Sequence, residues 1–395
     1  MFSFLKKPSR ARFAATVIAR IKEAGGPDFT LDLEKFEIRH GTTRGFLGNT
    51  YDAYCHARGA HRDAVLNNFV SAFVAQRQTS EISFEEAEPD IVTVIRERAL
   101  FSFSSLHWQL EQMEGIPQEL AEPVSRWFAK TAVIDSPGFM SLVNQDHATR
   151  WHQLGDEIFA LGLQKLRAST SPRFTESEGV FRGQWHDDYD SSRILVPEVF
   201  ADLPIQGDPV VVIPNRLTLL VTGSENTDAI RRMLQTAEEI VRSEPRRQNP
   251  APLVLRNGEI HDFFVDPLSP VFNDVERAHR LAALLYYDEQ KEKLEKLYEQ
   301  NGKEIFVGSY ILSRHDDGRH CSYSSVTKGV PTLLAVTDEV MFMDLDLPKD
   351  RQCVAQAPWP VVLERLPDLF LDTRMFPTRY YVSQFPTAEQ LEKLR

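Results

Sequence analysis

The sequence predicts an α+β fold, in which a mixed sheet with packed helices is followed by a second, smaller α+β domain. Residues 210–213 are four consecutive β-branched residues, and residues 217–222 alternate apolar with polar after a turn predicted at Pro214-Asn215. Such a run is tolerated only where both strand faces are covered, so Val212 is expected to be fully buried. Residues 230–241 place apolar side chains on one helix face. The regular strand and helix alternation of a doubly wound fold cannot be traced, which favours α+β packing.

The region before residue 266 is predicted to contain short helices and strands. The acidic stretch 81–90 is expected to be an exposed connection. Ser136 is expected to cap a helix whose first residue is Pro137 and whose apolar residues begin with Phe139. Apolar periodicity and turn residues predict the other elements: helices over 14–24, 63–76 and 156–167, a hairpin over 29–39 that turns near Glu34, and strands over 91–95 and 127–134.

Two prolines between Asp266 and Pro270 predict a domain boundary, because proline restricts the residue before it. The expected domains are therefore residues 1–265, with room for two lobes, and residues 271–395. The second domain begins with a long helix over 273–300 that ends at Asn301-Gly302. Its other predicted elements are a hairpin over 305–326 with a turn at Asp316-Asp317-Gly318, a hairpin over 331–342 around Thr337-Asp338, a strand over 379–384, and a short final helix with the capping box Thr387 and Gln390.

The order of motifs around the central hairpin resembles a known family. Tyr-Asp-Ser-Ser-Arg-Ile-Leu at 189–195 precedes a short helix, then Gly-Asp-Pro at 207–209 and the hairpin. The pattern over 29–39 with Leu-Gly-Asn-Thr-Tyr-Asp-Ala-Tyr at 47–54, and the pattern over 252–265, support the same likeness. The chain resembles the YtpQ-like family of uncharacterised bacterial proteins over residues 10–265. The resemblance implies a bacterial protein of this fold class and supplies no catalytic residues.

The 395 residues carry a formal net charge of −12 and are 42% apolar. An acidic chain disfavours general affinity for nucleic acid or an anionic membrane, since phosphate binding needs a positive surface. Arg242, Arg246 and Arg247 are the best candidates for a local basic patch. Cations are also favoured at the carboxyl end of a helix, so a solvated helix end is the simpler interpretation. Neither a nucleic-acid partner nor a membrane partner is predicted.

Cysteine usage and the apolar runs predict the compartment. Cys55, Cys321 and Cys353 are odd in number and widely spaced, which indicates reduced thiols rather than a disulfide framework or a clustered zinc site. The first residues lack the apolar core of a secretory signal, and no run approaches the roughly 18 apolar residues of a membrane span. The predicted location is cytoplasmic.

The loop of residues 186–190, here called the acidic loop, comes closest to a metal site. His186 beside Asp187, Asp188 and Asp190 suits a divalent cation, but the spacing lacks the central glycine and terminal glutamate of a calcium loop. A surface loop in which Asp190 caps the next helix is the simpler interpretation, so no metal site is predicted. A metal-dependent enzyme that uses these four residues is the alternative.

A second cluster contains His315, Asp316, Asp317, His320 and Cys321. A thiolate beside an imidazole becomes a nucleophile if a third group orients the base. Neighbouring residues of a strand point to opposite faces, however, so a plain hairpin is the simpler interpretation. A hydrolase that uses His320 and Cys321 is kept as an alternative. The sequence has no phosphate-binding loop, dinucleotide fingerprint, serine-hydrolase elbow or zinc-protease motif, and no cofactor is predicted.

The predicted ligand-binding residues are Asp208, Asn215 and Arg216, at the base and the tip of the hairpin. Arg216 is able to hold a carboxylate or phosphate through two hydrogen bonds, which makes a small-anion sensor the second alternative. An arginine that pairs with a nearby acid to hold the turn is the commoner case. Three aromatic residues also fit a ligand groove, although core packing is their commoner role: Trp151, Trp185 and Tyr189.

The leading functional hypothesis is a cytoplasmic protein that acts through protein contacts without catalysis. It rests on the lack of a complete catalytic set in the sequence. Whether the chain is an enzyme is left open at this point, and so is its oligomeric state.

Overall fold

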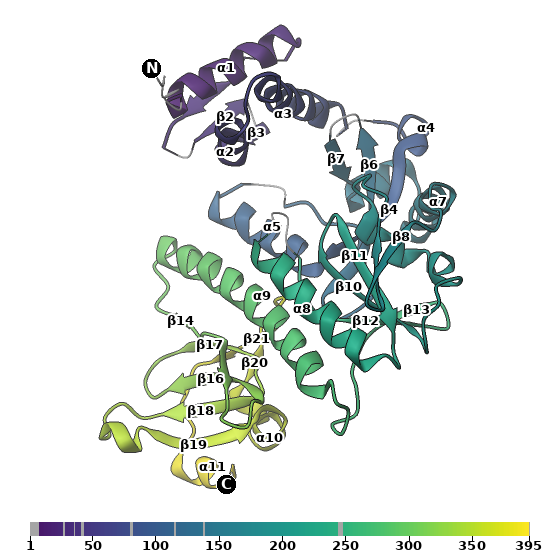
Figure 1. Ribbon diagram of the computed structural model, residues 1–395. Helices are drawn as coiled ribbons and strands as arrows, with labels where there is room; N and C mark the ends of the chain where they lie inside the picture. Colours follow the sequence, from purple (N-terminus) through teal and green to yellow (C-terminus); the bar gives the residue numbers. More distant parts are fainter. Residues whose placement is uncertain are drawn as a thin grey trace, which may run out of the picture. The chain divides into compact units, whose positions relative to one another are not determined.

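The computed structural model (Figure 1) describes residues 8–26, 28–34, 36–40, 43–79, 82–113, 116–136, 139–243 and 248–394. Helices pack on several sheets, so the predicted α+β class is confirmed. The chain divides into two compact units, unit 1 of residues 1–93 and 132–165 and unit 2 of residues 94–131 and 166–395. Three elements carry the chain between the units: β4 (Ile91–Glu97), β6 (Phe128–Ser136) and α7 (Gly155–Ala168).

The first part of unit 1 is a small α+β body with its own core. Ser9 caps its first helix, since its side chain accepts a hydrogen bond from the backbone N–H of Arg12 (3.3 Å). The predicted first helix and hairpin are confirmed, while the sequence does not predict the third strand. The elements are α1 (Arg10–Glu23), β1 (Thr30–Asp32), β2 (Glu37–His40), β3 (Thr43–Phe46), α2 (Gly48–His56) and α3 (Ala60–Thr79). The buried core includes Phe13, Val17, Ile21, Ile38, Leu47, Leu66 and Val70.

The acidic stretch before β4 is exposed, as predicted, but it is not irregular. Ser83 and Glu86 form a capping box in which each side chain accepts from the backbone N–H of the other residue, at 3.3 and 3.1 Å. This box begins α4 (Phe84–Ala87), which η1 (Glu88–Asp90) continues into the predicted strand β4.

The helix predicted to begin near Phe139 is wrong. Residues Phe139–Leu142 form strand β7, which pairs antiparallel with β6 and places Leu142 opposite Val133. A short apolar run does not distinguish strand from helix, and the backbone hydrogen bonds offered by β6 decide for the strand. Ser136 is consequently the last residue of β6 rather than a cap, and Pro137 lies outside the described residues. The next helix, α6 (Gln145–Trp151), is capped by Asn144.

Unit 2 is organised around a six-stranded antiparallel sheet in the order β13-β12-β10-β11-β9-β8. The predicted hairpin forms its centre, with Val211 opposite Val221, and Val212 is completely buried as expected. The turn, however, lies at Arg216-Leu217, because Asn215 still pairs with Thr218 after a bulge that follows Val212. A bulge accommodates Pro214, which has no N–H to donate to the ladder. The strands are β8 (Phe174–Ser177), β9 (Val180–Gly183), β10 (Pro209–Asn215), β11 (Thr218–Gly223), β12 (Leu253–Arg256) and β13 (Glu259–Asp262).

Helices cover both faces of this sheet. Helix α8 (Thr227–Ser243), the helix predicted from its apolar face, packs on the face that carries Val210, Val212 and Leu220. The opposite face packs against α5 (Arg98–Leu110) and the long helix α9 (Phe272–Gln300). The apolar residues of these elements form the most extensive buried cluster of the unit. Strand β5 (Ala121–Pro123) pairs antiparallel with β6, and the short helices η2 (Asp190–Leu195) and η3 (Pro197–Phe200) lie between β9 and β10 in the chain.

The carboxyl-terminal part of unit 2 contains two four-stranded sheets. One has the order β14-β17-β21-β20 and the other β15-β16-β18-β19, so the predicted hairpin over 331–342 is wrong: its two strands belong to different sheets. The strand predicted over 379–384 and the final capped helix are confirmed. The elements are β14 (Phe306–Val307), β15 (Ile311–Arg314), β16 (His320–Thr327), β17 (Thr332–Ala335), β18 (Glu339–Met343), η4 (Lys349–Arg351), β19 (Cys353–Pro358), α10 (Trp359–Arg365), η5 (Pro367–Leu369), β20 (Leu371–Asp372), β21 (Arg379–Val382) and α11 (Ala388–Glu392).

The predicted domain boundary at 266–270 lies inside unit 2, between β13 and α9. Whether the chain is cut there first by a protease stays a prediction. All three cysteines are free thiols. Within the described ranges, the helices are too short or too polar for any of them to cross a bilayer.

Candidate functional site

The three predicted ligand-binding residues do not meet in one place. Asp208, at the base of the hairpin, forms an ion pair with Arg256 (3.0 Å). Asn215, at the tip, is buried, and its side-chain oxygen accepts a hydrogen bond from the N–H of Leu217 (2.9 Å). Strand β10, seven residues long, separates base from tip, which is about 20 Å of extended chain. The backbone carbonyl of Arg216 accepts from the N–H of Ser191 (3.4 Å). Ligand binding by these residues stays a prediction.

Asp187 and Asp190 of the acidic loop are held by other groups of the protein, although Oδ2 of the buried Asp190 has no hydrogen-bond partner in the described parts of the chain. Asp187 accepts two hydrogen bonds from the guanidinium of Arg193, at 2.7 and 2.5 Å. Burial alone would raise the pKa of Asp187, but the hydrogen bonds and charge of Arg193 outweigh it and lower the pKa. Asp190 accepts from the N–H groups of Trp185 (3.2 Å) and His186 (3.1 Å), and so closes the loop instead of capping the next helix as predicted. Within the part of the chain that the structure describes, no group of three or more His, Cys, Asp or Glu side chains is placed to hold a metal ion.

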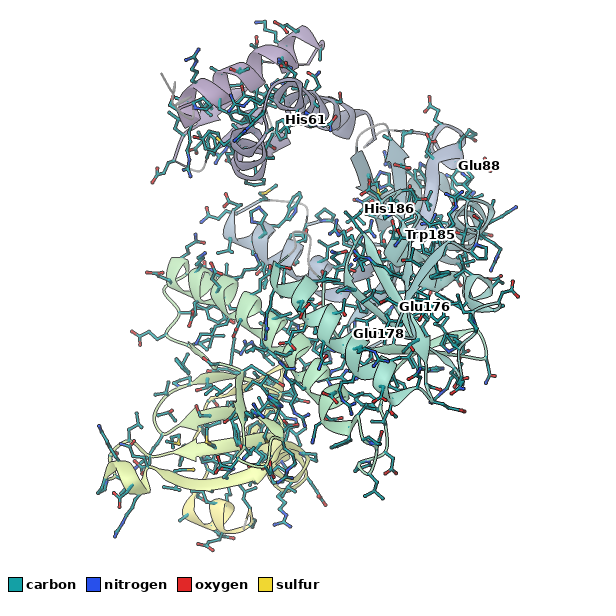
Figure 2. All side chains as sticks on the ribbon, in the orientation of Figure 1. His61, Glu88, Glu176, Glu178, Trp185 and His186 are labelled. Atoms are coloured by element: carbon teal, nitrogen blue, oxygen red, sulfur yellow. The ribbon has the colours of Figure 1, made fainter. Side chains whose placement is uncertain are left out.

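The partner of Asp187 is a fully buried arginine, since Arg193 has no exposed surface. Its guanidinium lies over the ring of Trp185, 4.5 Å from the centroid. Figure 2 labels Trp185 and His186, which follow β9 in the chain, together with Glu176 of β8 and Glu178 of the β8–β9 turn. The acidic loop is therefore tied to η2 by an ion pair whose arginine is buried and whose carboxylate is partly exposed, which is a structural use of its charge.

The aromatic residues predicted for a ligand groove are packing residues of separate units. In unit 1, the indole N–H of Trp151 donates to the carbonyl of Ile82 (2.9 Å). In unit 2, that of Trp185 donates to the carbonyl of Ser171 (2.7 Å). Both contacts are the polar anchors usual for buried tryptophans. Tyr189 is half-buried next to the acidic loop.

The predicted basic patch is only partly described. Arg242 pairs with Glu238 on the preceding turn of α8, whereas Arg246 and Arg247 lie outside the described residues.

The surroundings of Cys321 do not favour a reactive thiolate, and a hydrolase that uses His320 and Cys321 stays an untested alternative. Burial raises the pKa of the Cys321 thiol, which disfavours the thiolate at neutral pH. Its sulfur lies 3.9 Å from the carbonyl oxygen of Ser322, and the ring nitrogen Nε2 of His315 lies 2.8 Å from the hydroxyl of Tyr323. The confirmed β15–β16 hairpin is thus the better account of this cluster.

A cavity of about 300 Å³ in unit 2 brings together residues that the sequence does not connect. We call it the aromatic pocket. It takes residues from the start of α5, the turn before β6, α9, the end of β17, the start of α10, and the segment that leads into β21. Its lining consists of Arg98, Arg126, Trp127, Tyr287, Val336, Trp359, Phe376, Pro377, Thr378 and Tyr380.

Backbone hydrogen bonds fix the walls of the aromatic pocket. The hydroxyl of Ser125 accepts from the N–H of Trp127 (3.3 Å), which sets the turn before β6. The hydroxyl of Tyr287 donates to the carbonyl of Thr378 (2.7 Å) and accepts from the N–H of Val336 (3.1 Å). The two bonds of Tyr287 tie Thr378 and Val336 to α9, and the bond of Ser125 fixes the turn that carries Trp127.

The segment before β21 is tied to α5. The hydroxyl of Ser102 donates to the carbonyl of Phe376 (2.6 Å), at the cis peptide bond between Phe376 and Pro377. The rings of Phe376 and Trp127 are 5.9 Å apart in an edge-on arrangement, and those of Trp359 and Tyr380 are 5.2 Å apart. The cavity is therefore walled by aromatic rings that already pack on one another.

Two cations lie among these rings. The guanidinium of Arg98 stands over Phe376, 4.2 Å from the ring centroid, and donates to the carbonyl of Arg126 (2.9 Å). Arg126 stands over Trp127 at 4.8 Å. Neither guanidinium has a carboxylate within ion-pair distance among the described residues, although the charge of Asp262 acts on Arg98. Burial lowers the pKa of Arg98, as expected for a cation without an ion pair.

One more polar group of the pocket is unsatisfied. Trp127 is almost completely buried, and its indole N–H has no acceptor in the described parts of the chain. No aspartate or glutamate lines the cavity. The pocket therefore offers two positive charges, one free donor and several aromatic faces, a combination that suits a flat anionic molecule.

Sequence reasoning missed this pocket because none of its residues forms a local motif. In the sequence, Arg98 and Arg126 are isolated cations beside apolar segments. Phe376 completes the pocket through its contact with Ser102, from which it is 274 positions away in the sequence. Comparisons with family models, with curated proteins and with solved structures give no match to this chain. The likeness to the YtpQ-like family therefore stays a prediction.

Proposed function

We propose that this chain is a ligand-binding protein whose aromatic pocket holds a small molecule that joins a flat ring to an anionic group. The observation that carries the proposal is the pair Arg98 and Arg126, two guanidinium groups without a carboxylate partner among the described residues, in a cavity lined by aromatic rings. Arg98 is half-buried and Arg126 is exposed at the mouth of the cavity, so both guanidinium groups are open to a bound anion, which would supply the missing ion-pair partner.

The size of the pocket supports a compact ligand. A volume of about 300 Å³ is at the lower end of the range for small-molecule sites. Trp127, Trp359 and Tyr380 provide faces on which a ring can stack, and the two arginines can hold a carboxylate or phosphate through paired hydrogen bonds.

Binding without turnover fits the lining better than catalysis does. General acid or base catalysis uses a group that titrates near neutral pH, and the aromatic pocket contains no aspartate, glutamate, histidine, cysteine or lysine. Burial raises the pKa of Tyr287, and its hydroxyl is already engaged in two hydrogen bonds. The non-enzymatic role expected from the sequence is therefore part of the proposal.

The sequence predicts anion binding at Arg216, whereas we propose that the anion binds at Arg98 and Arg126 in the aromatic pocket. A cytoplasmic location, a protein partner and a bacterial origin stay predictions from the sequence.

Isothermal titration calorimetry tests the proposal with two pairs of probes, indole-3-acetate against indole-3-acetamide and adenosine monophosphate against adenosine. At least one anion should bind at least about tenfold more tightly than its neutral partner, because charge-assisted hydrogen bonds contribute about 1.5 to 3 kcal/mol. Arg98→Gln should abolish that preference, while Arg351→Gln, an exposed arginine of the same unit, should keep it. Equal binding of anion and neutral partner, or no binding of any probe, would refute the proposal.

A further inference from the structure

Unit 2 has a second cavity that the proposed function does not use. It measures about 340 Å³ and lies between the first turns of α9 and the β15–β16 hairpin. We call it the polar pocket. Its lining residues are Asn273, Asp274, Arg277, Arg314, Gly318 and His320.

The acids near the polar pocket form ion pairs with arginines, one of which, Arg277, lines the pocket itself. Asp274 forms an ion pair with Arg231 (3.2 Å). Glu238 of α8 pairs with Arg277 (2.6 Å) and also with Arg242. Two cations thus share Glu238, so the pocket keeps a positive balance despite these carboxylates.

Arg314 contributes a charge with no acid beside it. Among the described residues it has no carboxylate within ion-pair distance. Its guanidinium lies at the turn of the hairpin, since a β-carbon built on Gly318 would be 4.0 Å from Nη2 of Arg314. Arg314 and Arg277 therefore come from two different elements, β15 and α9, to line the same cavity.

His320 adds a buried nitrogen that lacks a partner. Its Nδ1 is inaccessible to solvent and has no hydrogen-bond partner in the described parts of the chain. Burial lowers the pKa of His320, and the charges of Arg277, Arg314 and Arg280 lower it further, with Glu238 opposing them. Burial first, and then these positive charges, disfavour the protonated ring, and an anion placed there would favour its protonation.

We propose that the polar pocket binds a phosphate group, free or as a monoester, between Arg277, Arg314 and His320. A phosphate carries close to two negative charges at neutral pH and several acceptor oxygens, which match two guanidinium groups and an imidazole that converge on one cavity. A singly charged carboxylate leaves part of this charge unbalanced. The site is separate from the aromatic pocket, with which it shares no lining residue.

Calorimetric titration of the full chain with inorganic phosphate tests the proposal. Arg314→Gln should weaken phosphate binding by about tenfold or more, the effect of losing one charge-assisted contact. Arg319→Gln is the matched control on the same turn, because Arg319 pairs with Asp317 (2.6 Å) and does not line the pocket. Its affinity should stay within about twofold of the unmodified chain. No phosphate binding in the millimolar range, or equal loss in both variants, would overturn the proposal.

A second arm uses sulfate, whose charge does not change between about pH 5.5 and 8, to isolate the titration of His320. The groups that act on this ring are Glu238 from α8, Arg277 and Arg280 from α9, and Arg314 from β15. Sulfate affinity should rise as the pH falls across this range, and His320→Asn should remove the rise. A flat profile in the unmodified chain contradicts the role given to His320.

A third arm compares inorganic phosphate with glycerol 3-phosphate. Tighter binding of the ester assigns the pocket to a phosphorylated small molecule, and tighter binding of the inorganic ion assigns it to free phosphate. Either result keeps the phosphate site, whereas competition of both with indole-3-acetate, which carries no phosphate, would contradict two separate pockets.

Discussion

The acidic loop and the aromatic pocket differ in how their charges are satisfied. The loop carries three aspartates and a histidine within five residues, yet Asp187 is held by Arg193 and Asp190 by backbone N–H groups. The aromatic pocket has only two charged side chains, and neither has an ion-pair partner among the described residues. We infer that a charge without a partner in a cavity indicates a binding site better than a high density of polar residues in the sequence does.

The largest expected effect concerns the sheet that supports both regions. Val212→Asp would bury a carboxylate without a partner between covered faces, at a cost of several kcal/mol, comparable with the stability of a typical domain. We expect insoluble or unfolded protein in an expression and circular-dichroism assay. Leu217→Asp is the matched control, because Leu217 is 41% exposed at the turn of the same hairpin. A Val212→Asp protein with an unchanged melting curve would show that Val212 does not lie between two covered faces of the sheet.

The next effect tests whether the acidic loop is structural. Asp187→Asn weakens the pair with Arg193, which has no exposed surface, and should lower the free energy of unfolding by about 1 to 3 kcal/mol. The cost stays below that of a fully buried pair because the Asp187 side chain is 42% exposed. Asp208→Asn removes an exposed pair with Arg256 and should cost less than about 1 kcal/mol. Urea denaturation of both folded variants measures the difference, and equal values would show that the loop pair is not special.

The elements with a clear apolar period could be predicted from the sequence. The central hairpin, α8 and α9 follow from β-branched runs and helical spacing, and the burial of Val212 follows from the same pattern. The turn is displaced to Arg216-Leu217 because a bulge is a tertiary adjustment that the local pattern does not encode.

Pairing between strands could not be predicted in the same way. Strand β7 and the separation of β17 from β18 depend on which neighbouring strand offers its backbone groups, and those neighbours are distant in sequence. The aromatic pocket was unpredictable for the same reason, since α5 and the segment before β21 meet only in the folded unit.

The free energy of unfolding and the affinity of the aromatic pocket should depend differently on pH. Burial lowers the pKa of His279, whose Nε2 lies 2.8 Å from the carbonyl of Phe263. A histidine with a lowered folded pKa stabilises the fold above its unfolded value near pH 6.5, and this stability is lost as the pH falls through the folded pKa. The free energy of unfolding should therefore fall below about pH 6.5, by at most about 1.4 kcal/mol per pH unit for this group.

Replacement of that histidine provides the control. His279→Gln should reduce the acid slope, whereas His261→Gln, at a half-exposed position of β13, should keep it. Affinity of the aromatic pocket for a sulfonated aromatic probe should stay constant over the same range, because no aspartate, glutamate or histidine lines it. A parallel fall of stability and affinity would show that the two regions are not separable.

Calorimetric titration of indole-3-acetate into the unmodified chain, Arg98→Gln and Asp187→Asn, each below its melting temperature, tests the central claim most directly. We expect Arg98→Gln to lose about tenfold or more in affinity with little loss of stability, since Arg98 has no ion pair among the described residues to break. Asp187→Asn should lose stability and keep its affinity within about twofold. The reverse result, in which Asp187→Asn loses the ligand and Arg98→Gln retains it, would place the binding site at the acidic loop and contradict ligand binding in the aromatic pocket.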